Sequence, residues 1–409
     1  MKKHFALFFL FHLTFSISNF TFSQGPWTQR AFMPGLARHR IFAFSIGSRG
    51  YIGCGWNGTD MYDDVWEYDP GSNSWSQKAN YPGGPRLCPF SFSIGNYGYV
   101  GAGLDQFLTS MNDFYRYDPV GNAWTSRANF AGSPRFGCAS AVYNNKGYVA
   151  MGDEWDPSYY RQNDLWRYDP SLDQWSYVSA WPADGRRDPV GFCIGNKLYF
   201  GTGSDNSYIE QNDLWCFDPS TGIWTQKANC GNDPRAQATG FAVNGKGYVG
   251  LGQIQSGQDM NDFLEYDPLN NTWRYINSSP AAARENCYAF VIGNKAYTAC
   301  GTSGINYNDL WEFDPALVTG MASTGASDVQ VNIFPNPLHT TSILEVPALK
   351  AFEGVKNFEL YDANGKKVRN FTFMQVQAKI ERDGLADGIY FYRITCNDKP
   401  IASGKLCVQ

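Results

Sequence analysis

The chain has 409 residues, including 42 glycines and 21 prolines, and its formal net charge is −5. A weakly acidic chain without basic clusters is a poor candidate for holding a polyanion, so we expect no nucleic-acid partner. Of its four histidines, His4 and His12 lie in the first 23 residues, which leaves His39 and His339 for the rest of the chain. Two isolated imidazoles argue against a histidine-rich metal site and a Ser-His-Asp triad, so we expect neither a metal nor a cofactor.

The first 23 residues are ordered like a secretory signal peptide. Lys2 and Lys3 precede an apolar run from Phe5 to Phe15, and small residues follow as far as Ser23. That order is typical of a signal peptide, and the run is shorter than the roughly 20 residues that a membrane span needs. We predict cleavage near Ser23, a secreted mature protein and no membrane span.

Residues 24–315 contain one pattern six times. Each repeat has an arginine-led strand, an aromatic strand, a strand that ends in Asp-Pro and, in five repeats, a strand centred on tryptophan. Alternating patterns bounded by turn residues are typical of antiparallel hairpins, and proline ends the third strand because it has no N–H to donate. The repeat prolines lie 47 to 51 residues apart: Pro70, Pro119, Pro170, Pro219, Pro268 and Pro315.

The two ends of the repeat region predict a closed ring. No tryptophan strand follows Pro315, but Trp27 precedes the first arginine. A strand around Trp27 would complete the last sheet and leave no long unpaired edge. We therefore predict an all-β fold, a six-bladed β-propeller closed by an N-terminal strand. The region resembles the kelch-repeat family, whose period is also about 50 residues.

The remaining residues form a predicted linker and a second domain. Residues 316–327 are rich in Gly, Ala, Ser and Thr, which is typical of a linker. Residues 328–409 resemble the C-terminal sorting domain (type A) of the type IX secretion system of Bacteroidetes. The resemblance implies a small β-sandwich, the outer-membrane type IX translocon as a partner, and a secreted or surface-attached protein. An immunoglobulin-like stalk is the alternative. The matching segments are residues 331–337, 359–366, 385–390 and 404–406.

The sharpest candidate site is a ring of six arginines at the start of the innermost strands, on the face that carries the variable loops between the second and third strands. Guanidinium groups bind carboxylates bidentately, and loop aromatics stack on sugar rings or peptide side chains. One aspartate also recurs in each repeat, and a buried arginine needs a partner, so structural pairing is the alternative. The ligand-binding candidates are Arg38, Arg86, Arg135, Arg186, Arg235, Arg284, Trp155, Tyr160, Tyr208 and Tyr307. The repeat aspartates are Asp64, Asp113, Asp164, Asp213, Asp262 and Asp309.

Acidic residues on the same face leave an enzyme open. A pair of carboxylates at a suitable separation could hydrolyse glycosides, and residues 153–156 could hold calcium although they lack a regular ligand spacing. Residues 81–86 resemble the kelch-type N-acetylneuraminate mutarotases. Copper-radical galactose oxidases share the propeller but need more histidines. The acidic candidates are Asp105, Asp153, Glu154, Asp156, Asp205 and Glu210.

These observations favour a non-enzymatic binding protein that recognises carbohydrate or, second, a peptide or protein. An enzyme acting on an acidic sugar and a purely structural surface module are the alternatives.

The cysteine spacing is not that of a metal site. A turn at residues 293–294 places Cys287 opposite Cys300, which makes them a candidate disulfide in an oxidising compartment. In the second domain we expect Cys396 opposite Ile401 and Cys407 opposite Tyr390, too far apart to bond.

Overall fold

The computed structural model describes residues 25–155, 160–276, 278–318, 331–334, 336–346, 354–362, 366–397 and 399–409. Two compact units divide between Thr319 and Gly320. The described residues form strands and one 3-10 helix, η1 (Pro315–Leu317), at the start of the predicted linker. This short helix was not expected; the Asp314 side chain caps it by accepting from the Ala316 N–H. The predicted signal peptide and most of the linker lie outside the described residues.

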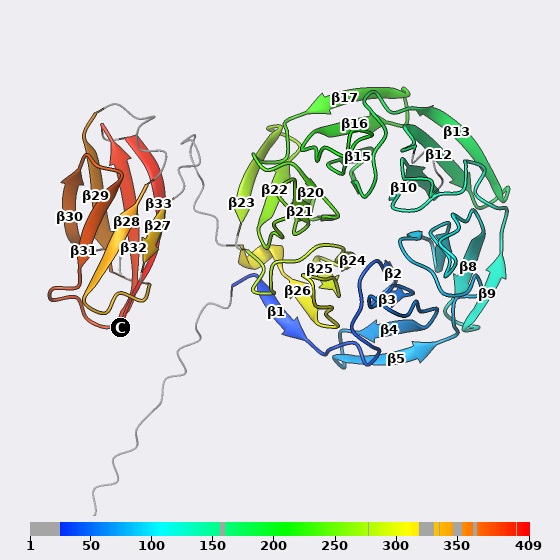
Figure 1. The fold of residues 1–409 in the computed structure, drawn as a ribbon, viewed down its shortest axis with the longest axis horizontal. Helices are drawn as coiled ribbons and strands as arrows, with labels where there is room; N and C mark the ends of the chain where they lie inside the picture. The colour runs from blue at the N-terminus through cyan, green and yellow to red at the C-terminus, as the bar shows by residue number, and fades with distance from the viewer. Residues whose placement is uncertain are drawn as a thin grey trace, which may run out of the picture. The chain divides into compact units, whose positions relative to one another are not determined.

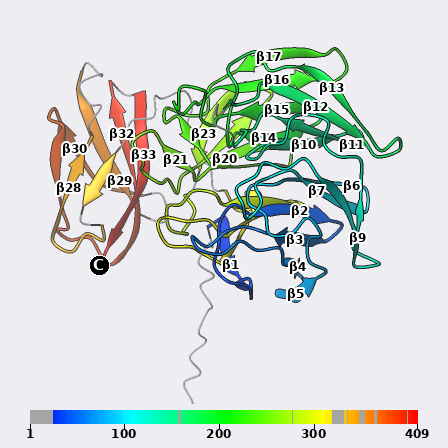
Figure 2. The ribbon, with the colours of Figure 1, turned by 45° about the vertical axis from the view of Figure 1, so that its right-hand side comes forward.

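The described part of the first unit contains six four-stranded antiparallel sheets arranged in a ring (Figure 1). We refer to the centre of this ring as the channel. We call each sheet a blade and name it by its innermost strand. Within a blade the chain runs outward, as the order from β2 to β5 shows in both views (Figures 1 and 2). The all-β propeller that the repeats predict is therefore present.

The bounds of the strands follow the repeats. The first three blades are β2 (Phe42–Ile46), β3 (Arg49–Gly53), β4 (Val65–Asp69), β5 (Ser74–Lys78); β6 (Phe90–Ile94), β7 (Tyr97–Gly101), β8 (Phe114–Asp118), β9 (Ala123–Ser126); and β10 (Ala139–Tyr143), β11 (Lys146–Ala150), β12 (Asp164–Asp169), β13 (Gln174–Ala180). The others are β14 (Val190–Ile194), β15 (Lys197–Gly201), β16 (Leu214–Asp218), β17 (Ile223–Lys227); β19 (Thr239–Val243), β20 (Lys246–Gly250), β22 (Phe263–Asp267), β23 (Thr272–Ile276); and β24 (Tyr288–Ile292), β25 (Lys295–Ala299), β26 (Leu310–Phe313), β1 (Trp27–Arg30). A two-stranded sheet joins β18 (Arg235–Ala236) to β21 (Gln253–Ile254).

The N-terminal strand completes the last blade. β1 pairs antiparallel with β26, and Trp27 lies opposite Phe313. The ring thus ends on a strand from the beginning of the chain, which removes the unpaired edge that β26 would otherwise present. This is the closure predicted from the missing sixth tryptophan.

Neighbouring blades are held together by two repeated contacts. Phenylalanines of innermost strands pack on glycines of the next blade: a Cβ on Gly98 would lie 2.3 Å from the Phe44 ring, so only glycine fits there. Each strand-four tryptophan reaches the previous blade, as when Trp124 Nε1 donates to the Ala79 carbonyl at 2.9 Å. These contacts explain why glycine and tryptophan recur at fixed repeat positions.

The second unit is a sandwich of two sheets around one apolar core. Leu344, Ile380, Phe358 and Ile394 come from both sheets and are fully buried. The three-stranded sheet contains β27 (Asn332–Phe334), β28 (Thr341–Glu345) and β31 (Gln377–Glu381). The four-stranded sheet has the order β30 (Lys367–Phe373), β29 (Lys356–Tyr361), β32 (Gly388–Cys396) and β33 (Lys399–Val408).

The expected register of the last two strands was wrong. β32 and β33 pair Cys407 with Ile389 and Cys396 with Lys399, where we expected Tyr390 and Ile401. The turn is tighter than expected, and a register shift between Ile394 and Thr395 displaces the rest of the ladder. Both cysteines are free thiols.

Candidate functional site

The six repeat arginines are buried inside their own blades. Arg86 is typical: its two terminal nitrogens donate to the two carboxylate oxygens of Asp113 at 2.6 and 2.9 Å, and also to the carbonyls of Ala102 and Gly83. The side chain is 0% exposed. An arginine–aspartate ion pair joins Arg38 to Asp64, Arg86 to Asp113, Arg135 to Asp164, Arg186 to Asp213, Arg235 to Asp262 and Arg284 to Asp309. Arg186 differs in donating to a single oxygen of Asp213, at 3.0 Å.

This geometry matches the structural alternative left open by the sequence. Each pair ties the segment before the first strand to the segment before the third, and each arginine is at most 3% exposed. A buried guanidinium without its carboxylate would be strongly destabilising, so the pairs belong to the scaffold. We assign no direct ligand contact to these arginines.

Two residues beyond each arginine, the backbone forms a closed ring around the channel. All six residues have positive φ, between 49° and 63°. Each of them donates its N–H to the carbonyl of its counterpart in the neighbouring blade, at 2.9 to 3.4 Å, and the last bond returns from Arg40 to Asn286. We call these residues the channel ring. They are Arg40, Cys88, Gly137, Asp188, Gln237 and Asn286.

A collar of short ladders lies next to the channel ring. In each blade, the residue that follows the repeat arginine bridges to the loop between the second and third strands, and that loop pairs with itself. The ladders are His39–Trp56–Met61, Leu87–Leu104–Ser110, Phe136–Asp153–Arg161, Arg187–Ser204–Glu210, Ala236–Gln253–Asp259 and Glu285–Thr302–Asn306.

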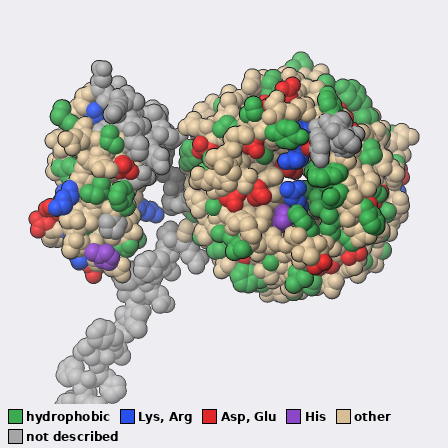
Figure 3. All heavy atoms as spheres, viewed as in Figure 1, with side chains coloured by type: hydrophobic (Ala, Val, Ile, Leu, Met, Phe, Trp, Pro, Cys, Tyr) green, Lys and Arg blue, Asp and Glu red, His purple; other side chains and the backbone are tan. Residues whose placement is uncertain are grey.

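The collar is divided into two chemically different arcs. The apolar arc, from the first three blades, contains Trp56, Met61, Leu87, Leu104 and Phe136, which form one hydrophobic cluster with Cys88. The charged arc, from the third blade onward, contains Asp153, Arg161, Arg187, Glu210, Asp259 and Glu285. Figure 3 shows this face of the propeller, with basic side chains at its centre, hydrophobic ones to the right and acidic ones to the left.

At the centre of the charged arc, two arginines share one carboxylate. Arg161 Nε lies 3.5 Å and Arg187 Nη1 3.7 Å from Asp153 Oδ2, and Arg187 Nε lies 3.4 Å from Asp188 Oδ2. Arg161 and Asp153 are 1% and 2% exposed. Burial raises the pKa of the Asp153 carboxyl against the opposing effect of both arginines. Burial and the charge of Arg187 lower the pKa of Arg161.

Several polar atoms of the collar and channel ring are buried without a hydrogen-bond partner among the described residues. Buried polar groups in proteins nearly always have a partner, so these atoms are candidates for hydrogen bonds to a ligand or to ordered water. These atoms are Asp153 Oδ1, Arg161 Nη2, Arg187 Nε, Asp188 Oδ2, Asn286 Nδ2, Glu210 Oε2 and Arg40 Nε. Of these, Arg187 Nε and Asp188 Oδ2 form an ion pair with each other at 3.4 Å.

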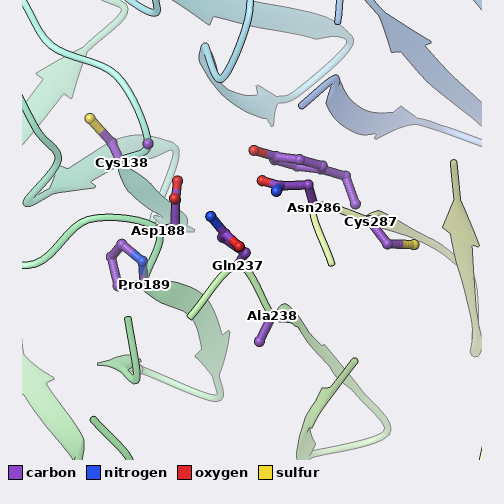
Figure 4. A pocket seen from close by; sticks show the side chains of 9 residues that line it. Cys138, Asp188, Pro189, Gln237, Ala238, Asn286 and Cys287 are labelled. Carbon is purple, nitrogen blue, oxygen red and sulfur yellow. The ribbon is translucent and has the colours of Figure 1, made fainter. Parts of the chain in front are cut away.

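A small pocket lies beside the channel ring. Its volume is about 40 Å³, room for a few water molecules. Asp188, Gln237 and Asn286 approach one another there (Figure 4). Arg40, across the ring, acts electrostatically on Asp188. The pocket can therefore take a single polar group, such as a hydroxyl.

Three of the four predicted aromatic residues are exposed beside the collar. Trp155, Tyr160 and Tyr208 are 41%, 53% and 54% exposed. The Tyr208 ring lies 4.4 Å from the Arg161 guanidinium. Tyr307 is half-buried, and its ring covers the Arg284 guanidinium at 3.8 Å.

The predicted acidic residues have separate roles. Asp105 and Asp205 each accept two backbone N–H bonds inside their own loops. Glu154 accepts from Gln162, and Asp156 lies outside the described residues. The described residues contain no group of three or more His, Cys, Asp or Glu that could hold a metal ion. Asp153 and Glu210 are the two of these residues that belong to the collar ladders.

The sequence analysis missed Arg40, Arg161, Arg187, Asp188 and Glu285. A signal for four of them was present, because the two residues after each repeat arginine differ from blade to blade. Positions that vary inside an otherwise regular repeat are free to serve a site rather than the fold.

The candidate disulfide is not formed in the structure. β24 and β25 pair Tyr288 with Ala299, which places Cys287 and Cys300 opposite each other as expected. Both are buried free thiols, and Cys287 Sγ donates to the Ala299 carbonyl at 3.2 Å. Burial raises the pKa of Cys287 to about 12.

Comparisons with known proteins agree with this architecture. The KLHDC2/KLHL20/DRC7 Kelch-repeats domain matches residues 192–319, and the secretion system C-terminal sorting domain matches residues 332–409. A solved structure titled "Structure of YjhT" superposes with a TM-score of 0.60 at 18% identity, covering 69% of this chain and 95% of that chain. That likeness supports the fold alone. No curated protein matches the chain.

The first unit has the β-propeller fold, and its residues 192–319 match a Kelch-repeats domain. The second unit is a secretion sorting domain, which engages the type IX secretion system and assigns the protein to the cell surface or the extracellular space. Both resemblances seen in the sequence are thereby confirmed. In the described residues, no helix is long and apolar enough to cross a membrane.

Proposed function

We propose that this exported protein binds a carbohydrate at the collar face of its propeller. The observation that carries the proposal is the divided collar, which has an apolar arc and a charged arc. In the charged arc, several buried polar atoms make no hydrogen bond to another described residue. A sugar ring has the matching chemistry, because it presents an apolar C–H face and an edge of hydroxyl groups. Binding sites of this kind combine apolar walls with a few convergent polar groups.

Different residues around the collar would contact the apolar face and the hydroxyl groups of the sugar. Trp155 and Tyr208 are exposed aromatics on which a sugar ring can stack. Asp153 and Glu210 offer carboxylate oxygens to hydroxyl donors, and Arg161 offers an N–H to hydroxyl oxygens. A peptide or protein ligand is the alternative outcome of the test.

A glycan-array experiment on the full chain tests the proposal. We expect selective binding, weakened roughly 3- to 10-fold by Trp155→Ala and by Tyr208→Ala. Leu269→Ala is the matched control, because Leu269 is 90% exposed in the turn at the far end of β22. Binding to no glycan, or binding that neither aromatic variant weakens, would contradict the proposal.

One observation favours an enzyme as the second candidate. Burial raises the pKa of Asp153, Glu210 and Glu285, and carboxyl groups with raised pKa values in a cleft are candidates for general acid–base catalysis. NMR of a bound sugar distinguishes the two functions. A binding protein leaves the anomer ratio and chain length unchanged, whereas an enzyme alters one of them and loses this effect in Glu210→Gln.

A further inference from the structure

We infer that the collar selects basic or neutral sugars over acidic ones, with amino sugars bound most tightly. This inference rests on the proposed carbohydrate function and specifies the charge of its ligand. It reverses the expectation from the arginine-rich repeats, which pointed to a carboxylate-bearing ligand.

The repeat arginines contribute little positive potential to the face. Each of the six is paired one-to-one with a repeat aspartate at salt-bridge distance. A close ion pair is nearly neutral when seen from a distance, so the remaining charges of the collar determine its potential. Those are the two arginines and four carboxylates of the charged arc. Burial lowers the pKa of the other ionisable collar residue, His39, to about 4, so it is neutral at pH 7.

The two collar arginines are already engaged by protein carboxylates. Both lie within 4 Å of Asp153, and Arg187 also approaches Asp188. An acidic ligand would have to replace these buried carboxylates, which would lose their own partners. On the other side of the arc, Glu285 and Asp259 form no ion pair among the described residues. With Arg40 and Asp188 of the channel ring included, this face carries three such arginines and five carboxylates, so the net formal charge of these groups is negative.

The unpartnered buried atoms include three carboxylate oxygens, on Asp153, Asp188 and Glu210, which can accept hydrogen bonds from an ammonium group or a hydroxyl. The four others are N–H groups, on Arg40, Arg161, Arg187 and Asn286, which can donate to hydroxyl oxygens of the same sugar. An ammonium group supplies three N–H donors and a positive charge. The exposed ring of Tyr208, which already faces one cation, offers a further favourable contact for a cationic ligand.

The test compares three hexasaccharides by calorimetry on the full chain at pH 6: one of glucosamine, one of N-acetylglucosamine and one of galacturonic acid. We expect the glucosamine hexamer to bind at least about 10-fold more tightly than the galacturonate, and the preference to shrink in 0.5 M salt. Glu285→Gln and Glu210→Gln should each reduce the preference about 3-fold or more. Glu381→Gln, an exposed carboxylate of the second unit, is the matched control and should leave it unchanged.

The outcomes separate this inference from the proposed function. If galacturonate binds most tightly, or if both glutamate variants keep the full preference, the charge inference is overturned while the carbohydrate function stands. If none of the three binds, the charge inference is overturned, and the glycan array decides the carbohydrate function. Unchanged melting temperatures of the variants exclude unfolding as the cause of lost binding.

Discussion

Removing the partner of a buried repeat arginine should destabilise the propeller strongly. In the β10 blade, Arg135 is 1% exposed and donates to both carboxylate oxygens of Asp164, to the Met151 carbonyl and to Ser133. Asp164→Ala leaves that guanidinium buried without a counter-ion, which costs about 3–5 kcal/mol. For a unit of this size, 1 kcal/mol shifts the melting temperature by about 2–4 °C, so we expect a decrease of about 6–20 °C.

Tryptophan fluorescence during thermal unfolding measures this effect, because all 13 tryptophans lie in the propeller. The matched control is Arg49→Ala, which breaks a half-exposed ion pair with Asp69 and should cost about 1 kcal/mol or less. The double variant Arg135→Met/Asp164→Leu should be no less stable than Asp164→Ala, because neither charge is left unpaired.

Two results would refute the scaffold assignment. The first is an Asp164→Ala protein that melts within about 2 °C of the wild type, which corresponds to at most about 1 kcal/mol. The second is an Arg135→Met protein that folds normally but loses glycan binding, which would return Arg135 to the binding site.

Three further predictions concern single residues. Cys287 and Cys300 are buried free thiols, so a reducing agent should leave the melting temperature unchanged; a decrease would indicate that they form a disulfide. The Lys367 ammonium beside Glu359 holds the pKa of that carboxyl at about 2, below its ordinary value of 4.5. Its contribution is complete above pH 4.5 and is lost as the pH falls toward 2, so the free energy of unfolding of the second unit, measured by chemical denaturation, should decrease over that window. Glu359→Gln should remove this part of the acid dependence, and an unaltered pH profile would contradict the assignment. Trp124→Phe deletes the indole donor to the preceding blade and should cost about 0.5–1.5 kcal/mol in chemical denaturation, whereas an unchanged midpoint would show that the bond contributes nothing.

The architecture was readable from the sequence because its signals are local. Strand alternation, the Asp-Pro turn and the recurring tryptophan are set within a few residues, and the repeat copies them along the chain. The missing sixth tryptophan even indicated how the ring closes, since Trp27 fills its place opposite Phe313. The sorting domain could also be predicted, because its sequence motifs occur in a fixed order along residues 331–406. The register of β32 and β33 could not be predicted, because the turn between them is tighter than expected and a bulge at Ile394 shifts the remaining pairs.

The assignment of charges to scaffold or site depended on the folded chain. Arg186 and Arg187 are neighbours in the sequence, yet Arg186 is sealed against Asp213 inside its blade while Arg187 contacts Asp153 in the collar. The backbone adopts a left-handed conformation immediately after them, at Asp188, and bonds there to the adjacent blades. Adjacent side chains thereby meet different surroundings, which only contacts between segments about 50 residues apart can establish. Residue type and spacing in the sequence predicted that arginines lie at the collar face. Packing between segments far apart in the sequence determines which of these arginines are buried in ion pairs and which lie in the collar.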